Sequence, residues 1–205
     1  MRNSNYMATN TSQNTKNIDP GVWGPPLWDM LFCFAYKLPP HIASDALHNI
    51  AKLLEKVLPC QHCRRSYILH AKQYKFNTDN PAQWLWTIHD MVNQNLGKNC
   101  ITYDKVQDKH QLFTCMTHPL NVVDLLCIMA SVIKHDGVVE FANAITDAAR
   151  NCPGLAMLEE CLPKLSQRSD LFTELWRAHS KLAIYSKIAP LDYGTFWKKY
   201  HQKIV

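Results

Sequence analysis

Apolar residues in the first part of the chain recur with helical spacing, in stretches that prolines separate. Pro25-Pro26 suits the first turn of a helix, and Pro39-Pro40 ends the apolar stripe that follows it. A second stripe leads up to Pro59, and its members are Ile42, Ala46, Ile50, Leu53, Leu54 and Val57. We therefore expect two successive amphipathic helices, with ordered structure beginning at Val22 or Trp23.

Two more helices are expected before residue 98. Pro59 ends the second stripe and places Cys60 near the start of a third helix. Asn80-Pro81 combines a capping side chain with a first-turn proline, and Gly97 suits the end of the fourth helix that they open. The apolar side of this helix consists of Trp84, Leu85, Ile88, Val92 and Leu96.

Helical patterns resume after Pro119, at 121–134, 137–151, 154–162 and 169–186, whereas residues 98–118 lack clear periodicity. No alternating strand pattern competes with them. The sequence therefore predicts an all-α fold, in which a four-helix bundle with a short fifth segment is followed by a second helical region. The expected parts are a disordered polar tail (1–17), a bundle domain (18–107), a linker (108–118) and a helical C-terminal domain of unknown role (119–205).

Composition supports a packed helical protein and excludes some functions. The chain has 205 residues, of which 47% are hydrophobic and only six are glycine. The net charge of +5 is scattered, and no block of lysine and arginine indicates a nucleic-acid site. The apolar stretches are interrupted well before the roughly 20 residues that a membrane-spanning helix needs. We expect neither nucleic-acid binding nor a membrane span.

The cysteine content is high for a chain with no visible export signal. Residues 1–17 are rich in Asn, Thr and Ser and lack an apolar segment, so a disordered tail is the better interpretation than a signal peptide. The chain nevertheless has eight cysteines. Because reducing compartments keep thiols free, this pattern indicates a compartment with its own oxidation route, or an enzyme that supplies one.

Cys60 and Cys63 form the motif that carries chemistry. A Cys-x-x-Cys pair can form and break a disulfide repeatedly, and a helix start together with Arg64 and Arg65 favours the thiolate. His89 and Asn93 are four residues apart, so on a helix they point the same way. They offer two polar groups to one flat ligand. Together these features predict a dithiol that transfers electrons to a bound redox cofactor.

These residues resemble the FAD-linked sulfhydryl oxidases of the Erv/ALR type. The resemblance covers about residues 22–106 and depends on three blocks that occur in a fixed order. They are Trp23-Gly24 with Trp28; Pro59-Cys60-Gln61-His62-Cys63-Arg64; and Trp84-Leu85 leading to His89, Val92, Asn93, Leu96, Gly97 and Lys98. A lone Cys-x-x-Cys would be a weak signal, whereas three blocks with these separations are specific.

The resemblance implies a small helical bundle that binds FAD and forms a homodimer. Such enzymes oxidise protein dithiols, or a thioredoxin-like carrier, and pass the electrons through FAD to O2, giving H2O2. By this likeness Cys63 lies against the flavin and forms a transient sulfur–flavin adduct, while Cys60 exchanges with the substrate. The implied cofactor-binding residues are Gly24, Trp28, His89, Val92, Asn93, Leu96 and Lys98.

The chain departs from the family pattern at four positions. A histidine common in the family is replaced by Phe32, and an aromatic residue five positions further on is replaced by Lys37. Many members also have a disulfide bracketing the His-Asn helix, and its two positions hold Trp86 and Tyr103 here. Since both halves of that disulfide are missing, we expect packing to hold this helix instead.

Three other interpretations remain open at this stage. Cys60 and Cys63 could be half of a zinc site, which His62, His70 or His118 would have to complete. The protein could instead be a non-enzymatic interaction protein that lost flavin through the changes at Phe32 and Lys37. It could also be a thiol–disulfide carrier that works without flavin.

The remaining cysteines have less specific patterns. Cys152 and Cys161 flank Pro153-Gly154 and could form a structural disulfide, act as a redox shuttle, or be inert thiols. Cys33 and Cys127 lie in apolar stripes and are expected to be buried small hydrophobic residues. The pairing of Cys100 and Cys115 cannot be deduced from the sequence.

The location and the C-terminal domain are predicted by likeness alone. A short core with an unfamiliar extension is similar to the versions of large DNA viruses, which support disulfide formation in virion proteins. This predicts the host cytoplasm or the virion, with the mitochondrial intermembrane space as the alternative. The C-terminal region would enlarge the dimer interface, bind a partner, or be a decayed second copy of the bundle.

Overall fold

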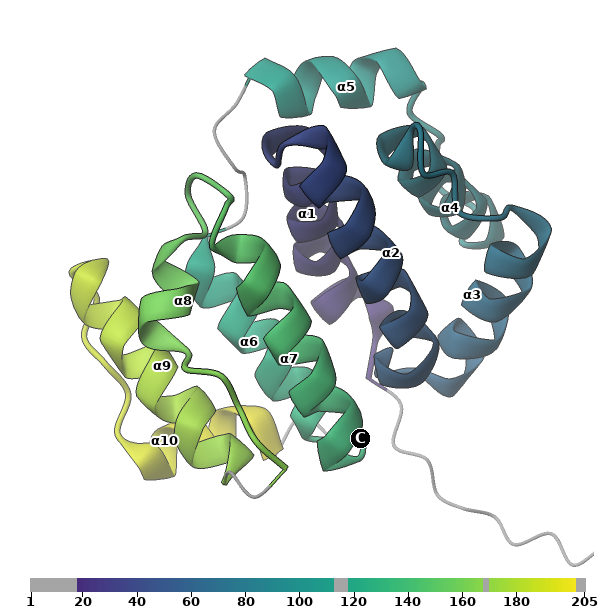
Figure 1. Ribbon diagram of the computed structural model, residues 1–205. Helices are drawn as coiled ribbons and strands as arrows, with labels where there is room; N and C mark the ends of the chain where they lie inside the picture. Colours follow the sequence, from purple (N-terminus) through teal and green to yellow (C-terminus); the bar gives the residue numbers. More distant parts are fainter. Residues whose placement is uncertain (1–17, 113–117, 168–169, 202–205) are drawn as a thin grey trace, which may run out of the picture.

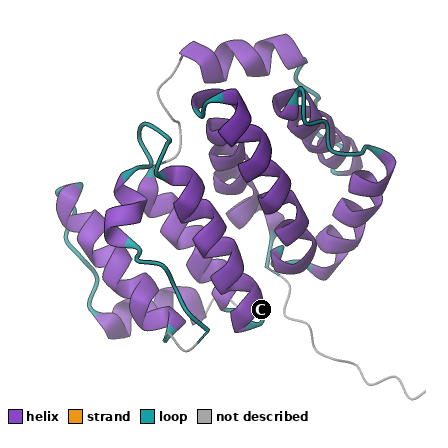
Figure 2. Ribbon diagram, viewed as in Figure 1, coloured by secondary structure: helices purple, strands orange, loops and turns teal. Residues whose placement is uncertain are grey.

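The computed structural model describes residues 18–112, 118–167 and 170–201. In these ranges the chain forms ten α-helices and no strand, which confirms the predicted all-α class (Figure 2). The tail at 1–17 and Cys115 lie outside the described residues. No helix in the described ranges is both long and apolar enough to cross a membrane.

Helix α1 (Pro20–Lys37) begins earlier than the sequence pattern suggested. The side chain of Asp19 accepts a hydrogen bond from the backbone N–H of Gly21, and Pro20 occupies the first turn. The expected start at Val22 or Trp23 was therefore wrong, because capping by Asp19 decides the boundary.

The next four helices complete the first half of the molecule. They are α2 (Pro40–Val57), α3 (Gln61–Gln73), α4 (Pro81–Asn95) and α5 (Tyr103–Leu112). Cys60 is the N-cap of α3 and Asn80 is the N-cap of α4, as expected. Helix α5 extends beyond the expected bundle domain, so the first residues of the expected linker at 108–118 are helical.

Five further helices make up the second half. They are α6 (Pro119–Ala130), α7 (His135–Ala149), α8 (Met157–Cys161), α9 (Leu171–Tyr185) and α10 (Tyr193–His201). The sequence pattern missed α10, which is only nine residues long and is anchored by two buried aromatic residues one turn apart, Phe196 and Tyr200. Short helices depend on tertiary packing more than on local pattern.

The two halves share one hydrophobic core. In the first half α1 packs against α2, α4 and α5, and α3 packs against α2 and α4. Between the halves, α2 packs against α7 and α1 against α6, so these four helices form the centre of the molecule (Figure 1). Helices α8, α9 and α10 lie on the far side of α6 and α7.

Candidate redox and cofactor site

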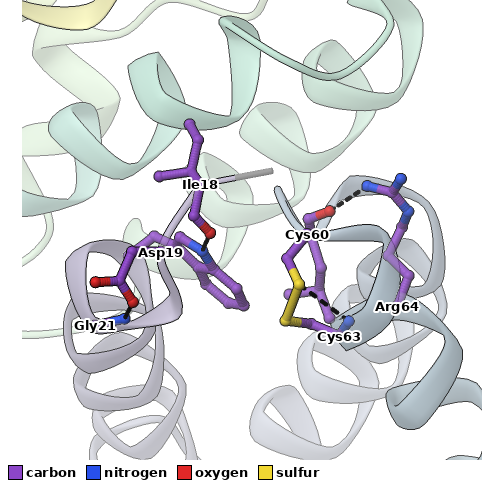
Figure 3. The surroundings of a disulfide bond; sticks show 8 residues. Ile18, Asp19, Gly21, Cys60, Cys63 and Arg64 are labelled. Carbon is purple, nitrogen blue, oxygen red and sulfur yellow. Dashed lines mark hydrogen bonds between the residues drawn. A yellow bond between two sulfur atoms is a disulfide. The ribbon is translucent and has the colours of Figure 1, made fainter. Parts of the chain in front are cut away.

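Cys60 and Cys63 form a disulfide at the start of α3 (Figure 3). Cys60 has extended backbone geometry as the N-cap, and its sulfur accepts a hydrogen bond of 3.1 Å from the backbone N–H of Cys63. Unpaired N–H groups at a helix start stabilise negative charge, so reduction of this disulfide would leave a Cys60 thiolate with a donor in place. Cys60 is 8% exposed and Cys63 is half-buried.

The backbone around the disulfide is fixed by nearby polar contacts. The N–H of Ile18 donates to the carbonyl of Pro59 at 3.1 Å, and the indole N–H of Trp23 donates to the carbonyl of Ile18 at 3.1 Å. Arg64 donates to the carbonyl of Leu58, so its guanidinium braces the loop before the motif (Figure 3). These bonds hold the start of the described chain beside the redox motif.

A cluster of rings joins α1 to α4. The Trp28 ring lies 4.7 Å from the His89 ring and the Phe32 ring lies 5.6 Å from it, both edge to face. Nδ2 of Asn93 lies 3.4 Å from Nε2 of His89. The structure thus brings together three of the residues predicted to bind a cofactor.

The surroundings of His89 favour its neutral form. Burial lowers the pKa of His89, and the nearby Lys98 and Lys109 lower it further, against the opposing effect of Asp90. A neutral imidazole can both donate and accept a hydrogen bond, and it packs against an aromatic surface without an ionic penalty. This environment suits contact with a flat heteroaromatic ligand.

The other predicted cofactor residues lie at the ends of the same two helices. Gly24 is buried near the start of α1, and a Cβ added there would have no heavy atom within 4 Å. At the far end of α4, Gly97 has φ of 65° and closes the helix, so that Lys98 follows in the exposed turn. Val92 is half-buried and Leu96 is 51% exposed.

These residues fit a cofactor with an aromatic part and a negatively charged part. Open space beside Gly24 and the faces of Trp28 and His89 suit a ring system, and the exposed ammonium of Lys98 suits phosphate groups. A cavity of about 670 Å³ lies elsewhere, between the α1–α2 turn and residues 78–82. It contains none of the predicted site residues, so we do not assign it to the cofactor.

Comparison with known proteins agrees with this geometry. The sequence model of the Erv1 / Alr family matches residues 25–111. A protein of Invertebrate iridescent virus 6, named FAD-linked sulfhydryl oxidase 347L, is 30% identical over 99 residues, which cover 40% of this chain and 86% of that protein.

The chain belongs to the Erv1 / Alr family. The predicted resemblance is therefore confirmed, and the matched range contains the redox motif and both sides of the ring cluster. No solved structure matched the chain.

Two ring residues near the family site were not predicted from the sequence. His110 of α5 is buried and stacks on Phe32 at 5.0 Å and on Tyr36 at 5.8 Å between ring centroids. Burial, with help from Lys109, Lys37 and His89, lowers the pKa of His110 to about 4. Tyr36 follows Phe32 by one turn, which is a signal in the sequence, whereas His110 lies in a segment without periodicity.

Packing does replace the disulfide that many Erv1 / Alr members have around α4. The Trp86 ring lies 5.9 Å from the Tyr103 ring, and the indole N–H of Trp86 donates to the carbonyl of Ile101 at 2.8 Å. These contacts join α4 to the start of α5. The prediction made from the paired loss of cysteines is confirmed.

Cys152 and Cys161 do not form the structural disulfide that was one of the three interpretations of this pair. Cys152 and Cys161 are both free and buried, and burial raises the pKa of the Cys152 thiol to about 11. The free thiol of Cys152 lies 3.3 Å from the sulfur of Cys33 without being disulfide-bonded to it. Cys33 is buried as expected but is disulfide-bonded, so it is not the inert thiol that we predicted.

The two remaining described cysteines are free thiols, and the described residues do not support a zinc site. Cys127 is a buried free thiol, and Cys100 is an exposed one. Among the residues that the structure describes, no group of three or more His, Cys, Asp or Glu side chains could hold a metal ion.

Proposed function

We propose that this protein is an FAD-dependent sulfhydryl oxidase that converts pairs of protein thiols to disulfides. The observation that supports it best is the Cys60–Cys63 disulfide at the start of α3, in a chain that shares its family with a viral FAD-linked sulfhydryl oxidase. FAD, when bound, accepts two electrons from the Cys60–Cys63 dithiol and passes them to O2. The balance is two thiols and O2 giving one disulfide and H2O2.

The chain's own residues carry the thiol exchange. A substrate thiolate attacks the sulfur of Cys60, forms a mixed disulfide, and releases Cys63 as a thiolate. The second substrate thiol then attacks the substrate sulfur of that mixed disulfide, and Cys60 leaves. The backbone N–H of Cys63 donates to the departing sulfur and stabilises its negative charge, which favours this second step. In this proposal Cys63 is the cysteine nearer the flavin.

The cofactor would be held by both ends of the ring cluster. Trp28 and His89 contact its aromatic parts, Asn93 fixes the imidazole and bonds to the ligand, and Lys98 neutralises phosphate charge. Gly24, Val92 and Leu96 complete the surface. The open space beside Gly24 and the burial of His89, which lowers its pKa, support this assignment.

The proposed substrates are dithiols of proteins or of a thioredoxin-like carrier, with O2 as the acceptor. The viral relative supports a role in the host cell or the virion, where the enzyme would form disulfides in virion proteins.

Oxygen uptake in the presence of dithiothreitol tests the activity. Full-length protein should consume O2 and yield an equal amount of H2O2, and Cys63→Ser should abolish this. Cys100→Ser is the matched control because Cys100 is an exposed free thiol, and it should leave the rate unchanged. A wild-type protein that consumes no O2 would overturn the proposal and favour a flavin-free carrier or an interaction protein.

Trapping of a mixed disulfide tests the two roles separately. In Cys63→Ser the Cys60 thiolate should attack a disulfide of an oxidised protein substrate and accumulate the mixed disulfide, with the other substrate sulfur released as a thiolate, whereas Cys60→Ser should not. The opposite result would show that the roles are exchanged, because burial alone does not separate the two sulfurs.

A further inference from the structure

We infer that residues 119–201 are a second, cofactor-free copy of the family domain, which takes the place of a second subunit within one chain. The assignment of the cofactor to the first half rests on the proposed function. It also means that the chain is a monomer, in place of the homodimer that the family resemblance implies.

The two halves have the same order of packed helices. Helices α6 to α10 follow one another as α1 to α5 do, and each neighbouring pair in the second set has a counterpart in the first. Thus α6 packs on α7 and α9, α8 packs on α7 and α9, and α10 packs on α9, as α1, α3 and α5 do with α2 and α4 (Figure 1). The same helix order, with a counterpart in the first half for each packed pair of the second, is expected of a duplicated domain.

The buried positions of the first two helices agree when 95 is added to their numbers. Of the eight buried residues of α1, all but Trp23 fall on buried residues of α6. All seven buried residues of α2 fall on buried residues of α7 or on buried Cys152. Asp29, Leu31 and Ile50 meet identical residues, which are Asp124, Leu126 and Ile145.

Helices α4 and α9 correspond in finer detail when 90 is added. Both have 15 residues, and their N-caps Asn80 and Asp170 each accept a hydrogen bond from the backbone N–H three residues on. His89 meets His179. The helix ends match as well, because Gly97 and Lys187 have φ of 65° and 57°.

The hydrogen bonds of that turn repeat one by one. In the first half the N–H groups of residues 96, 97 and 98 donate to the carbonyls of residues 92, 94 and 93, respectively. In the second half the N–H groups of residues 186, 187 and 188 donate to the carbonyls of residues 182, 184 and 183, which are the same positions when 90 is added. A left-handed conformation is unfavourable for a lysine and easy for a glycine. Descent from a glycine-ended helix explains why Lys187 is found there.

A tryptophan contact also recurs. The indole N–H of Trp176 donates to the carbonyl of Leu191 at 2.9 Å, as that of Trp86 donates to the carbonyl of Ile101 at 2.8 Å. The Trp176 ring lies 5.4 Å from the ring of Tyr193, and Trp86 has the same edge contact with Tyr103. Two unrelated helical regions would not share this set of contacts at a constant offset.

The second copy has lost the parts that the proposed function needs. The offset falls from 95 to 90 between α2 and α4, so the second copy is five residues shorter where the first has its redox motif, and α8 has five residues against 13 in α3. At neither offset does a cysteine pair match Cys60 and Cys63. The counterparts of Trp28, Asn93 and Lys98 are Val123, Ala183 and Ile188.

The equivalent of the cofactor site is closed by an ionic cluster. Asp124 accepts a hydrogen bond from the hydroxyl of Tyr200, lies 3.2 Å from Nζ of Lys199, and lies 3.6 Å from Nε2 of His179. In the first half the ring of Trp28 contacts His89 instead. The second histidine therefore supports packing between α6, α9 and α10.

The contact between the halves is the kind that two equal subunits make. A twofold axis brings the same surface of each copy together, so corresponding elements meet. Here α1 meets its counterpart α6, and α2 meets its counterpart α7. The second copy thus covers this face from within the chain.

Light scattering coupled to gel filtration tests the inference, and it does so whether or not flavin is present. The full chain should have the mass of a monomer, 23.6 kDa. Twice that mass would overturn the claim that the second half replaces a subunit. A protein without flavin would contradict the proposed function but would leave this measurement valid.

Flavin content per chain tests the loss of the second site. We expect one FAD per chain, released by His89→Ala or Lys98→Ala and retained in His179→Ala and Ile188→Ala. Ile188 is 54% exposed, so Ile188→Ala keeps the comparison usable if the variant at buried His179 does not fold. Two FAD per chain, or release of flavin by Ile188→Ala, would overturn the cofactor-free assignment.

Discussion

The histidines of α4 and α9 occupy equivalent positions, but the proposed ligand site beside the first histidine is open and the equivalent region beside the second is filled by side chains. His89 faces the rings of Trp28 and Phe32, while His179 faces the carboxylate of Asp124. Burial lowers the pKa of both imidazoles, so burial is not the difference. Both imidazoles have an aromatic ring edge to face, since His179 lies 5.4 Å from the Phe196 ring. The difference is Asp124, whose carboxylate lies beside His179 and is also bound by Tyr200 and Lys199.

The largest expected effect concerns the redox motif, which only the first half has. Cys60→Ser should lower turnover with protein substrates by on the order of 10³-fold or more, because the exchanging nucleophile is removed. Flavin content should not change. Cys161→Ser in the second half should leave turnover as it is, and a comparable loss there would show that the second half takes part in the redox reaction.

A double variant of the α4 end should release the cofactor. Asn93→Ala with Lys98→Ala removes a hydrogen bond and a phosphate-neutralising charge, which together should weaken FAD binding by roughly 100-fold. Flavin retained after gel filtration is the readout. Unchanged FAD content would refute the assignment of these two residues.

The ionic cluster should matter more for stability than its counterpart in the first half. Asp124→Ala leaves the Tyr200 hydroxyl and Lys199 without their shared acceptor, so it should lower the free energy of unfolding by about 2 kcal/mol. Burial raises the pKa of the Asp29 carboxyl, against the opposing effect of Lys109, so its charged form gains little in the fold and Asp29→Ala should cost less than about 1 kcal/mol. Urea unfolding measures both, and equal losses would contradict the comparison.

The sequence predicted most of this scaffold where local chemistry decides it. Asn80-Pro81 gave the start of α4, Gly97 gave its end, and Pro59 placed Cys60 at a helix start. It did not predict the Asp19 cap or α10. The role of Phe196 and Tyr200 in α10 depends on their packing against distant parts of the chain, which the local sequence does not show. From the sequence, duplication was one of three options for the C-terminal region. Few identical residues remain at equivalent positions of the two halves, and they are scattered; Trp86 with Trp176 and Tyr103 with Tyr193 are examples.

The pairing of cysteines was the least predictable feature. A local bridge was one of three interpretations of Cys152 and Cys161, yet both thiols are free, and the sulfur 3.3 Å from that of Cys152 belongs to Cys33, which is 119 residues away in the sequence. Proximity of this kind follows from the packing of α1 against the second half. No local pattern reports it.

Acid should destabilise the first half through His110. The pKa of His110 in the folded protein is about 4, below the roughly 6.5 of an unfolded histidine, so the unfolded state takes up a proton first as the pH falls. The stability due to neutral His110 is complete above about pH 6.5 and is lost as the pH falls towards 4.

His110→Tyr provides the control, because tyrosine is the residue at the equivalent position 200. The melting temperature of the variant should fall less between pH 7 and pH 4 than the melting temperature of the wild type. An identical pH profile for the two proteins would show that His110 does not carry this effect.

The smallest expected effect concerns the two helix ends. Lys187→Gly removes left-handed strain and should stabilise the protein by about 1 kcal/mol, while Gly97→Ala should destabilise it by about as much. Thermal unfolding of the pair measures both signs. A destabilising Lys187→Gly would show that the lysine side chain makes contacts that outweigh the strain.

The visible spectrum of the purified full-length protein during reduction by a dithiol tests the central claim most directly. The account predicts one flavin per chain, bleaching when dithiothreitol is added without air, recovery when air is admitted, and no bleaching in Cys63→Ser. A folded but colourless protein, or a flavin that bleaches equally fast in Cys63→Ser, would contradict it.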